Sequence, residues 1–281
     1  MKISEAIDMT AALLLESGIT EARREATSLL GFAIKKEKAF LIAYPDHELR
    51  EPELKYFIDL VNRRMVREPF QYIAGRQEFY GLEFNVSADV LIPRPETEIL
   101  VEQAIRELSK TSKPAFLEIG VGSGCISISV LNELQHAGAV GVDISERALA
   151  VTQANAEKHH VEDRLTLRRA DLYDGISEKF DLIVSNPPYV PREQISGLQT
   201  EVARYEPHIA LDGGPGGLVI IERIIAKAPN FLTSGGRLLI EIGFGQAESV
   251  ERLFLPAIWD AAEFINDLQG IPRVVTARLR R

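Results

Sequence analysis

The chain has 281 residues, of which 46% are hydrophobic and 26% charged, and it carries a formal net charge of −9. These values are ordinary for globular proteins, and the length suits two domains better than one. No apolar run approaches the length that spans a bilayer, and the amino terminus lacks the apolar core of a signal peptide. We therefore expect a cytoplasmic protein with no membrane partner.

The negative charge is unevenly distributed along the chain. Residues 1–80 carry a net charge of −1 and the remainder carries −8. Binding to a nucleic-acid backbone depends on Lys and Arg side chains, so the acidic remainder argues against direct nucleic-acid binding. Cys125 is the only cysteine, and the five histidines show no metal-ligand spacing, so we expect neither a disulfide nor a metal site.

Residues 1–76 predict a small helical domain. Thr20 can cap a helix. That helix would carry its small and apolar side chains on one face: Ala22, Ala26, Leu29, Leu30 and Ala33. A later helix would carry a second apolar stripe: Leu54, Phe57, Ile58, Val61 and Met65. A helical module ahead of an enzyme domain usually docks or positions a substrate, so we expect that role for this domain.

Residues 77–98 predict a connector. The alternating apolar pattern around Gly81 predicts a hairpin, and Pro93 and Pro95 stiffen the extended segment that follows. Glu96 or Thr97 can begin the next helix. The connector is either a rigid interdomain linker or a cover over the mouth of an active site.

Residues 99–281 alternate short apolar runs with amphipathic segments, which predicts a doubly wound, mostly parallel sheet with helices on both faces. The expected strands are 115–119, 139–143, 165–167, 180–186 and 236–242, followed by a closing pair at 259–265 and 274–279. An α/β fold of this kind binds its ligands at the carboxyl ends of the strands.

A glycine-rich loop follows the first of these strands. Glycines allow a tight turn and a close approach to a ligand beside a helix N-terminus. Asp143 ends the next strand, where a carboxylate can accept both hydroxyl groups of a ribose. The combination predicts a nucleoside cofactor. The G-x-G-x-G spacing of residues 120–124 departs from the dinucleotide fingerprint, which argues against NAD and FAD.

A rigid corner, residues 185–189, directly follows the apolar run 180–184. Pro187 and Pro188 donate no backbone hydrogen bond, and Pro187 keeps Asn186 out of the helical region. The corner therefore holds the amide of Asn186 and the ring of Tyr189 at the edge of the sheet. Glu118, Glu201 and Glu206 form no paired-carboxylate pattern, and we interpret Glu118 as a cofactor-loop residue and Glu206 as structural.

Taken together, residues 118–124, 141–143 and 186–189 resemble a class I S-adenosylmethionine-dependent methyltransferase that methylates nitrogen. The segments 69–75, 92–98, 206–214 and 241–246 narrow the resemblance to the release factor glutamine methyltransferases, also called the HemK or PrmC family. The match covers essentially the whole chain.

This resemblance implies a Rossmann-like sheet that is mostly parallel with a closing antiparallel strand. It also implies a cytoplasmic role in translation termination, and S-adenosylmethionine as the cofactor, with S-adenosylhomocysteine as the product. It implies a protein substrate, the glutamine of the Gly-Gly-Gln motif in class-1 peptide chain release factors, methylated on the side-chain amide nitrogen. We expect a monomer. The implied cofactor-binding residues are Gly120, Val121, Gly122, Ser123, Gly124, Asp143, Leu172 and Asn186.

The implied substrate-binding residues are Asn186, Pro187, Pro188 and Tyr189, and of these we expect Asn186, Pro187 and Tyr189 to act in catalysis. Leu172 departs from the family, which often has an aromatic residue there. Asn-Pro-Pro-Tyr also occurs in DNA adenine methyltransferases, and a ribosomal-protein glutamine methyltransferase would share both motifs. A nucleoside-binding regulatory module is the non-enzymatic alternative, but it leaves Asn186 unexplained.

Overall fold

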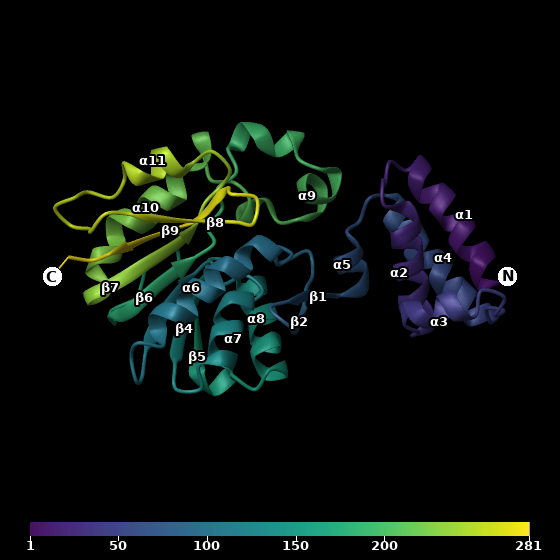
Figure 1. Ribbon diagram of the computed structural model, residues 1–281, viewed down its shortest axis with the longest axis horizontal. Helices are drawn as coiled ribbons and strands as arrows, with labels where there is room; N and C mark the ends of the chain where they lie inside the picture. The colour runs from purple at the N-terminus through teal and green to yellow at the C-terminus, as the bar shows by residue number, and fades with distance from the viewer. Residues whose placement is uncertain (281) are drawn as a thin grey trace. The chain divides into compact units, whose positions relative to one another are not determined.

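The computed structural model describes residues 1–280, and the chain divides into two compact units (Figure 1). Unit 1 comprises Met1–Gly75 and Gln199–Tyr205, and unit 2 comprises Arg76–Leu198 and the chain from Glu206 onward. A short segment from the second half of the chain therefore belongs with the amino-terminal helices. The domain boundaries that we predicted at residues 76 and 98 stay a prediction.

Unit 1 is helical. Its helices are α1 (Ile3–Glu16), α2 (Ala22–Ile34), α3 (Lys38–Ala43), α4 (Glu51–Met65), α5 (Phe70–Ala74) and α9 (Thr200–Tyr205). The predicted apolar face of α2 is buried against α1 and α4. Two details of the prediction are wrong. Glu21 rather than Thr20 precedes α2, without a side-chain cap, and Ile58 is 47% exposed because the buried face of α4 runs through Phe57, Leu60, Val61 and Arg64 instead.

Unit 2 contains the predicted hairpin and a larger sheet. The hairpin pairs β1 (Arg76–Phe79) with β2 (Leu82–Asn85). Within residues 1–280 the larger sheet has seven strands in the order β5-β4-β3-β6-β7-β9-β8. These strands are β3 (Ala115–Ile119), β4 (Gly138–Asp143), β5 (Leu165–Arg169), β6 (Phe180–Ser185), β7 (Leu232–Glu241), β8 (Glu263–Asn266) and β9 (Pro272–Arg278).

The sheet from β5 to β7 is parallel, whereas β9 pairs antiparallel with both β7 and β8. The predicted mostly parallel fold with a closing antiparallel element is thus confirmed. The predicted strand 259–265 is wrong at its start. Trp259 is buried and makes only an isolated bridge with Leu279, and the strand begins at Glu263.

Helices cover both faces of the sheet, as Figure 1 shows. Helices α6 (Glu98–Leu108), α7 (Cys125–Glu133) and α8 (Glu146–Lys158) lie on one face, and α10 (Val219–Lys227) and α11 (Ala247–Glu251) lie on the other. Successive strand residues alternate between the two cores: Leu182 and Val184 pack with α6, and Ile183 packs with α10. This double burial explains why the strands are continuous apolar runs in the sequence.

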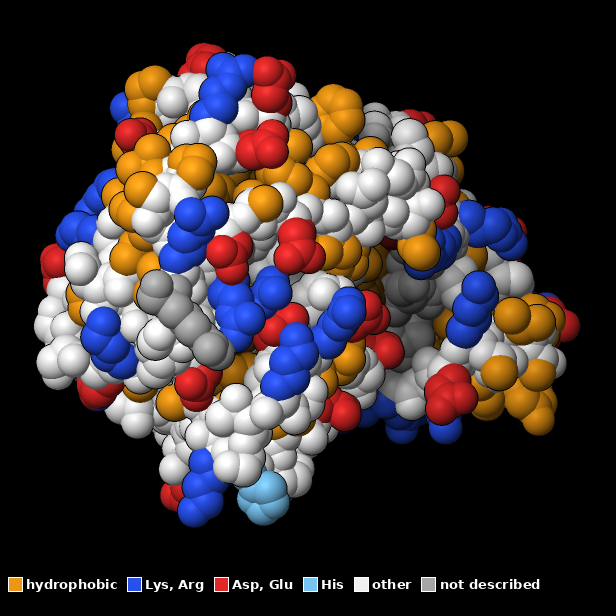
Figure 2. Space-filling model, turned by 60° about the vertical axis from the view of Figure 1, so that its left-hand side comes forward, with side chains coloured by type: hydrophobic (Ala, Val, Ile, Leu, Met, Phe, Trp, Pro, Cys, Tyr) orange, Lys and Arg blue, Asp and Glu red, His pale blue; other side chains and the backbone are white. Residues whose placement is uncertain are grey.

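Short 3₁₀ segments complete the chain between these elements. They are η1 (Pro95–Thr97), η2 (Glu162–Arg164), η3 (Arg192–Gly197), η4 (His208–Ala210), η5 (Pro215–Gly217) and η6 (Ala228–Asn230). No helix among residues 1–280 has the length and apolar character needed to cross a membrane. On the face drawn in Figure 2, basic and acidic side chains are intermixed.

Candidate active site

The carboxyl ends of the parallel strands bring the predicted site residues into one row. Ile119 at the end of β3 lies opposite Ser185 of β6, and Ser185 lies opposite Ile240 of β7. The hydroxyl of Ser185 donates to the backbone carbonyl of Ile119 at 2.8 Å, which ties the two strands together at this edge. The glycine loop after β3 and the Asn186 corner after β6 are therefore neighbours, as expected for an open α/β sheet.

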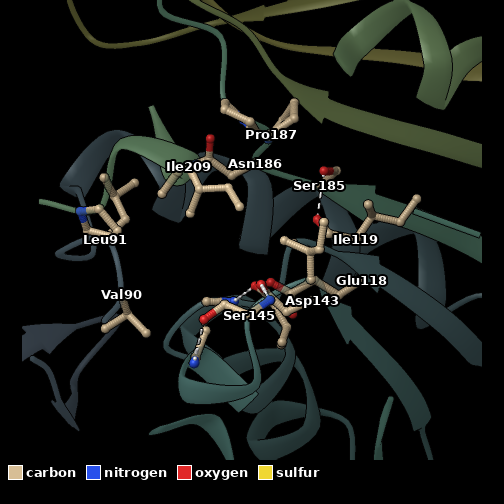
Figure 3. A pocket seen from close by; sticks show the side chains of 18 of the residues that line it. Val90, Leu91, Glu118, Ile119, Asp143, Ser145, Ser185, Asn186, Pro187 and Ile209 are labelled. Atoms are coloured by element: carbon tan, nitrogen blue, oxygen red, sulfur yellow. Dashed lines mark hydrogen bonds between the residues drawn. The ribbon is translucent and has the colours of Figure 1, made fainter. Parts of the chain in front are cut away.

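A cavity of about 400 Å³ opens along this edge. Its lining includes most of the predicted residues: Gly120, Val121, Gly122, Ser123, Asp143, Leu172, Asn186, Pro187 and Pro188. Figure 3 shows Asn186 and Pro187 on one side of the cavity and Asp143 on the other. Gly124 and Tyr189 are not among the lining residues. The volume is in the range of small-molecule sites.

The glycine loop has the shape of a cradle. Gly120 has a φ of +73°, and a Cβ built there would stand 4.0 Å from the carbonyl oxygen of Asn186, in the space between the loop and the corner. Gly124 has a φ of +81°, and its Cβ would collide with the Thr152 side chain at 2.7 Å. Glycine at position 120 therefore leaves room for a ligand to approach the backbone of the loop, and glycine at position 124 allows the loop to pack closely on α8.

Asp143 anchors the loop from the neighbouring strand. Its Oδ2 accepts from the backbone N–H of Gly122 at 3.0 Å, and its Oδ1 accepts from the N–H of Ser145 at 2.8 Å. Burial raises the pKa of Asp143 above its ordinary value, while these backbone donors oppose the rise. Each carboxylate oxygen keeps further acceptor capacity, which fits the two hydroxyl groups of a ribose.

Leu172 contributes an apolar wall beyond Asp143. It is 7% exposed and lines the cavity in a left-handed backbone conformation, with a φ of +57°. This conformation is unusual for leucine and is held next to Asp171, whose carboxylate accepts from Arg223 at 2.8 Å. The wall fits a flat, apolar face such as that of a nucleobase.

The Asn186 corner faces the loop across the cavity. The Asn186 amide donates through Nδ2 to the hydroxyl of Thr97 at 3.1 Å. Tyr189 is turned to the other side of the corner, where its hydroxyl donates to Glu241 at 3.3 Å and its backbone carbonyl accepts from Gln246 at 2.9 Å. Burial raises the pKa of Tyr189, so the hydroxyl remains a donor at neutral pH. The corner thus places Asn186 in the lining of the cavity, with its Nδ2 donating to Thr97.

Comparisons with known proteins agree with this geometry. A family model described as the PrmC N-terminal domain matches residues 5–75, and one described as the methyltransferase small domain matches residues 96–203. The chain is 44% identical to the release factor glutamine methyltransferase of Geobacter sulfurreducens over 278 residues, covering 99% of this chain and 96% of that one. It is 38% identical to the enzyme of the same name from Koribacter versatilis over 280 residues, covering 99% of each.

The chain belongs to the release factor glutamine methyltransferase family. The family and the methyltransferase class that the sequence predicted are thereby confirmed. A crystal structure of a methyltransferase from Pyrococcus furiosus superposes with a TM-score of 0.53 at 15% identity, covering 78% of this chain and 98% of that one. At that identity the likeness supports the fold alone. Membership of a methyltransferase family implies the use of S-adenosylmethionine.

Part of the connector lines the cavity, while the choice between a rigid linker and a cover over the mouth of an active site stays a prediction. Pro93, Arg94 and Thr97 belong to the lining. The predicted helix start is also explained: Thr97 precedes α6 but makes no side-chain cap, because its hydroxyl donates to the carboxylate of Glu241 at 2.7 Å instead. Among residues 1–280, no cluster of His, Cys, Asp and Glu suits a metal ion.

The three glutamates considered in the sequence occupy different places. Glu118 is 1% exposed at the end of β3 and accepts from the backbone N–H of Ser127 at 2.8 Å and from its hydroxyl. Burial raises the pKa of Glu118 to about 8, against the Ser127 hydrogen bonds that lower it, and the nearby Asp143 adds to the rise. Glu206 is buried against Arg94, and Glu201 lies in unit 1.

Sequence reasoning missed Thr97 and Glu241 as site residues. Both are 2% exposed, and they join Asn186 and Tyr189 in one hydrogen-bonded group. A signal was present for Glu241. Glu241 ends the apolar run of β7. Glu118 and Asp143 likewise lie near the ends of β3 and β4. A charged residue at the end of a buried strand indicates the edge of the sheet where ligands bind. Thr97 was noticed only as a possible helix start.

Proposed function

We propose that this protein transfers a methyl group from S-adenosylmethionine to the side-chain amide nitrogen of the glutamine in the Gly-Gly-Gln motif of class-1 peptide chain release factors. The observation that carries the proposal is the Asn186 amide, held across the cavity from the glycine loop and Asp143. Relatives named release factor glutamine methyltransferase match nearly the full chain, which supports this substrate over others.

The donor would occupy the side of the cavity built by residues 120–124 and Asp143, with Leu172 beside the adenine. The positive φ at Gly120 and the acceptor capacity of Asp143 support this assignment. When bound, S-adenosylmethionine supplies a methyl group already activated on a sulfonium, and S-adenosylhomocysteine is left. The proposal requires no metal.

The acceptor, the amide nitrogen of a glutamine side chain, is a poor nucleophile. The lone pair of an amide nitrogen is delocalised into its carbonyl, so the protein has to align the nitrogen with the methyl group. Asn186 Oδ1 would accept a hydrogen bond from one N–H of the substrate amide, and the backbone carbonyl of Pro187 would accept a hydrogen bond from the other N–H. Positive charge that develops on the nitrogen would strengthen both hydrogen bonds, which lowers the barrier. The methylated nitrogen would then release one proton to water, which leaves the neutral N-methyl amide. The ring of Tyr189 would support the corner from behind.

We assign substrate docking to the helical amino-terminal domain at residues 1–76, with 77–98 as connector and 99–281 as the catalytic domain. The family model that matches residues 5–75 supports a dedicated element there. The acidic charge of the chain after residue 80 supports a protein substrate rather than a nucleic acid. We propose a cytoplasmic monomer.

The test is a labelled methyl-donor assay in which a release factor, a ribosomal protein fraction and DNA are offered in parallel. We expect label in the release factor alone. A release factor whose motif glutamine is replaced by alanine is the matched control and should remain unlabelled, since the acceptor nitrogen is gone.

Two outcomes would replace the proposal with an alternative. Label in ribosomal proteins but not in the release factor would indicate a ribosomal-protein glutamine methyltransferase. Label in DNA and not in protein would indicate an adenine methyltransferase, which flips its base into a similar corner.

A further inference from the structure

Two side chains of the acceptor corner, Asn186 and Tyr189, are joined through Thr97 and Glu241 in a single hydrogen-bonded chain. Asn186 Nδ2 donates to Thr97 Oγ1 at 3.1 Å, and the Thr97 hydroxyl donates to Glu241 Oε2 at 2.7 Å. The other carboxylate oxygen of Glu241 accepts from the Tyr189 hydroxyl at 3.3 Å. The residues come from η1, β7 and the corner after β6, so the group exists only in the folded unit.

The hydrogen-bonded chain has a direction, which follows from the number of donors and acceptors that each of its four side chains offers. An ionised carboxylate only accepts, so the single hydrogen of the Thr97 hydroxyl is committed to Glu241. Thr97 Oγ1 can then only accept from Asn186, which requires the amide nitrogen and not the amide oxygen to face it. A flipped Asn186 would place Oδ1 against the Thr97 oxygen and would point an NH₂ group at the substrate's own NH₂ group.

We propose that Thr97 and Glu241 are positioning residues for methyl transfer, which hold Asn186 with Nδ2 on Thr97 so that Oδ1 accepts from the substrate amide. This inference rests on the proposed function, because the acceptor must be an NH₂ group for the orientation to matter. It also explains the segment 241–246, to which the sequence assigned no role: Glu241 holds Asn186 through Thr97, and Gln246 holds the carbonyl of Tyr189.

Burial restricts the hydrogen-bond partners that Thr97 and Glu241 can find. Thr97 and Glu241 are each 2% exposed, so water is not at hand to replace a lost partner. Within residues 1–280, the bond to Thr97 is the one that the Asn186 side chain makes. The register supports the same unit, since Ser185 lies opposite Ile240, which places the residues that follow, Asn186 and Glu241, side by side at the sheet edge.

The experiment compares Thr97→Val with Thr97→Ser. Valine has the shape of threonine without the hydroxyl, and serine keeps the hydroxyl and loses the methyl group. For each variant, kcat and KM are measured with the release factor, and the dissociation constant of S-adenosylmethionine is measured separately by calorimetry. Wild-type protein is run beside them with the same release factor.

We expect Thr97→Val to lower kcat about tenfold or more, which is less than the roughly 10²–10³-fold loss when a group that itself contacts the reacting atoms is removed, because Thr97 acts through Asn186. The donor dissociation constant should stay within about threefold, because the donor side of the cavity is built by residues 120–124 and Asp143. KM for the release factor should rise by no more than about threefold, because the Asn186 amide makes only one hydrogen bond to the substrate. Thr97→Ser should retain kcat within about threefold. A merely structural role would instead lower donor affinity and kcat together.

The inference is overturned if Thr97→Val retains kcat within about threefold, if Thr97→Ser is as slow as Thr97→Val, or if donor binding falls in step with kcat. Should Thr97→Val fail to fold, Thr97→Ala provides the same comparison with Thr97→Ser, since both side chains are smaller than threonine. Failure of the proposed function has a different signature, because wild-type protein would then leave the release factor unlabelled.

Discussion

Arg67 and Glu201 lie 134 positions apart in the chain and form a two-pronged ion pair, with Nε to Oε1 at 2.7 Å and Nη2 to Oε2 at 2.6 Å. Arg64, whose side chain is 5% exposed, donates to the same Glu201 at 2.9 Å and also pairs with Glu25. These contacts place α9 in unit 1, although the chain on both sides of α9 belongs to unit 2. Within unit 1, Gln199–Tyr205 is therefore held by the amino-terminal helices.

Glu201→Ala should destabilise unit 1 by about 2 kcal/mol, because it removes the charged partner of a buried arginine that keeps only Glu25. Urea unfolding followed by far-UV circular dichroism measures the change. The matched control is Glu248→Ala. Its pair with Arg252 is exposed, with side chains 80% and 71% accessible, and its removal should change little. Equal effects of the two substitutions would contradict the prediction.

Asn186→Ala should abolish methyl transfer while the donor dissociation constant stays within about tenfold, or roughly 1.4 kcal/mol. The reason is that the amide faces the acceptor side of the cavity, and the donor side is built by other residues. Single-turnover assays and calorimetry measure the two quantities. Asn266→Ala, an exposed asparagine on β8, is the control. A parallel loss of donor binding would mean that Asn186 serves the donor.

Asp143→Ala should chiefly weaken donor binding, by at least about tenfold. The substitution removes the acceptors of the Gly122 and Ser145 N–H groups and with them the ribose contact. Calorimetric titration with S-adenosylmethionine measures the effect. Asp163→Ala, an exposed aspartate in η2, should bind the donor normally. Unchanged binding by Asp143→Ala would refute the ribose assignment.

Glu118 makes stability depend on pH. Its pKa is raised from 4.5 to about 8 in the folded protein. Between these values the folded state keeps a proton that the unfolded chain has released, so the stabilisation from Glu118 is complete below pH 4.5 and is lost as the pH rises through 8. Glu118→Gln stays neutral and should therefore unfold at a higher temperature than wild type at pH 9, and the difference should be much smaller at pH 5.5.

Thermal unfolding across that pH range measures this effect, and Glu248→Gln, at an exposed position, should follow the wild type throughout. A fall in unfolding temperature from pH 5.5 to pH 9 that is the same in Glu118→Gln and wild type would show that Glu118 is not the group responsible.

Glu241 should make kcat depend on pH, with lower values at acidic pH (an acidic limb of the pH profile). Burial raises its pKa to about 7, while hydrogen bonds from Thr97 and Tyr189 and the charge of Arg273 oppose the rise and Glu96 adds to it. Once protonated, Glu241 can donate to Thr97, which reverses the hydrogen-bond chain and favours the flipped Asn186. We therefore expect kcat to fall as the pH drops below about 7.

The limb is assigned by comparing two variants in a kcat profile from pH 5.5 to pH 9. Glu241→Gln has no titrating group there and should lose the limb, whereas Glu118→Gln should keep it. Cys125 also interacts electrostatically with Glu241, and Arg94 interacts with Tyr189, the hydrogen-bond partner of Glu241. A limb that persists in Glu241→Gln would assign it to one of the other titrating groups.

The helices and strands were predictable where one local pattern dominated. The continuous apolar runs of β3, β4, β6 and β7 reflect burial on both faces, and the α2 face follows the helical period. The start of β8 was missed because Trp259 is buried without belonging to a strand, and apolar character alone does not separate the two cases. Ile58 was misplaced because α4 buries the stem of Arg64 on the face that a hydrophobic pattern assigns elsewhere.

By itself, the sequence determined the family, the parallel sheet and the two motifs that meet at its edge, because glycines, prolines and strand ends carry their geometry locally. Only the tertiary structure decided that Thr97 and Glu241 stand behind Asn186 and that Glu201 lies among the amino-terminal helices. Those relationships join residues 89 to 144 positions apart through side-chain hydrogen bonds. Such bonds depend on which strands and helices become neighbours, and no local pattern encodes that.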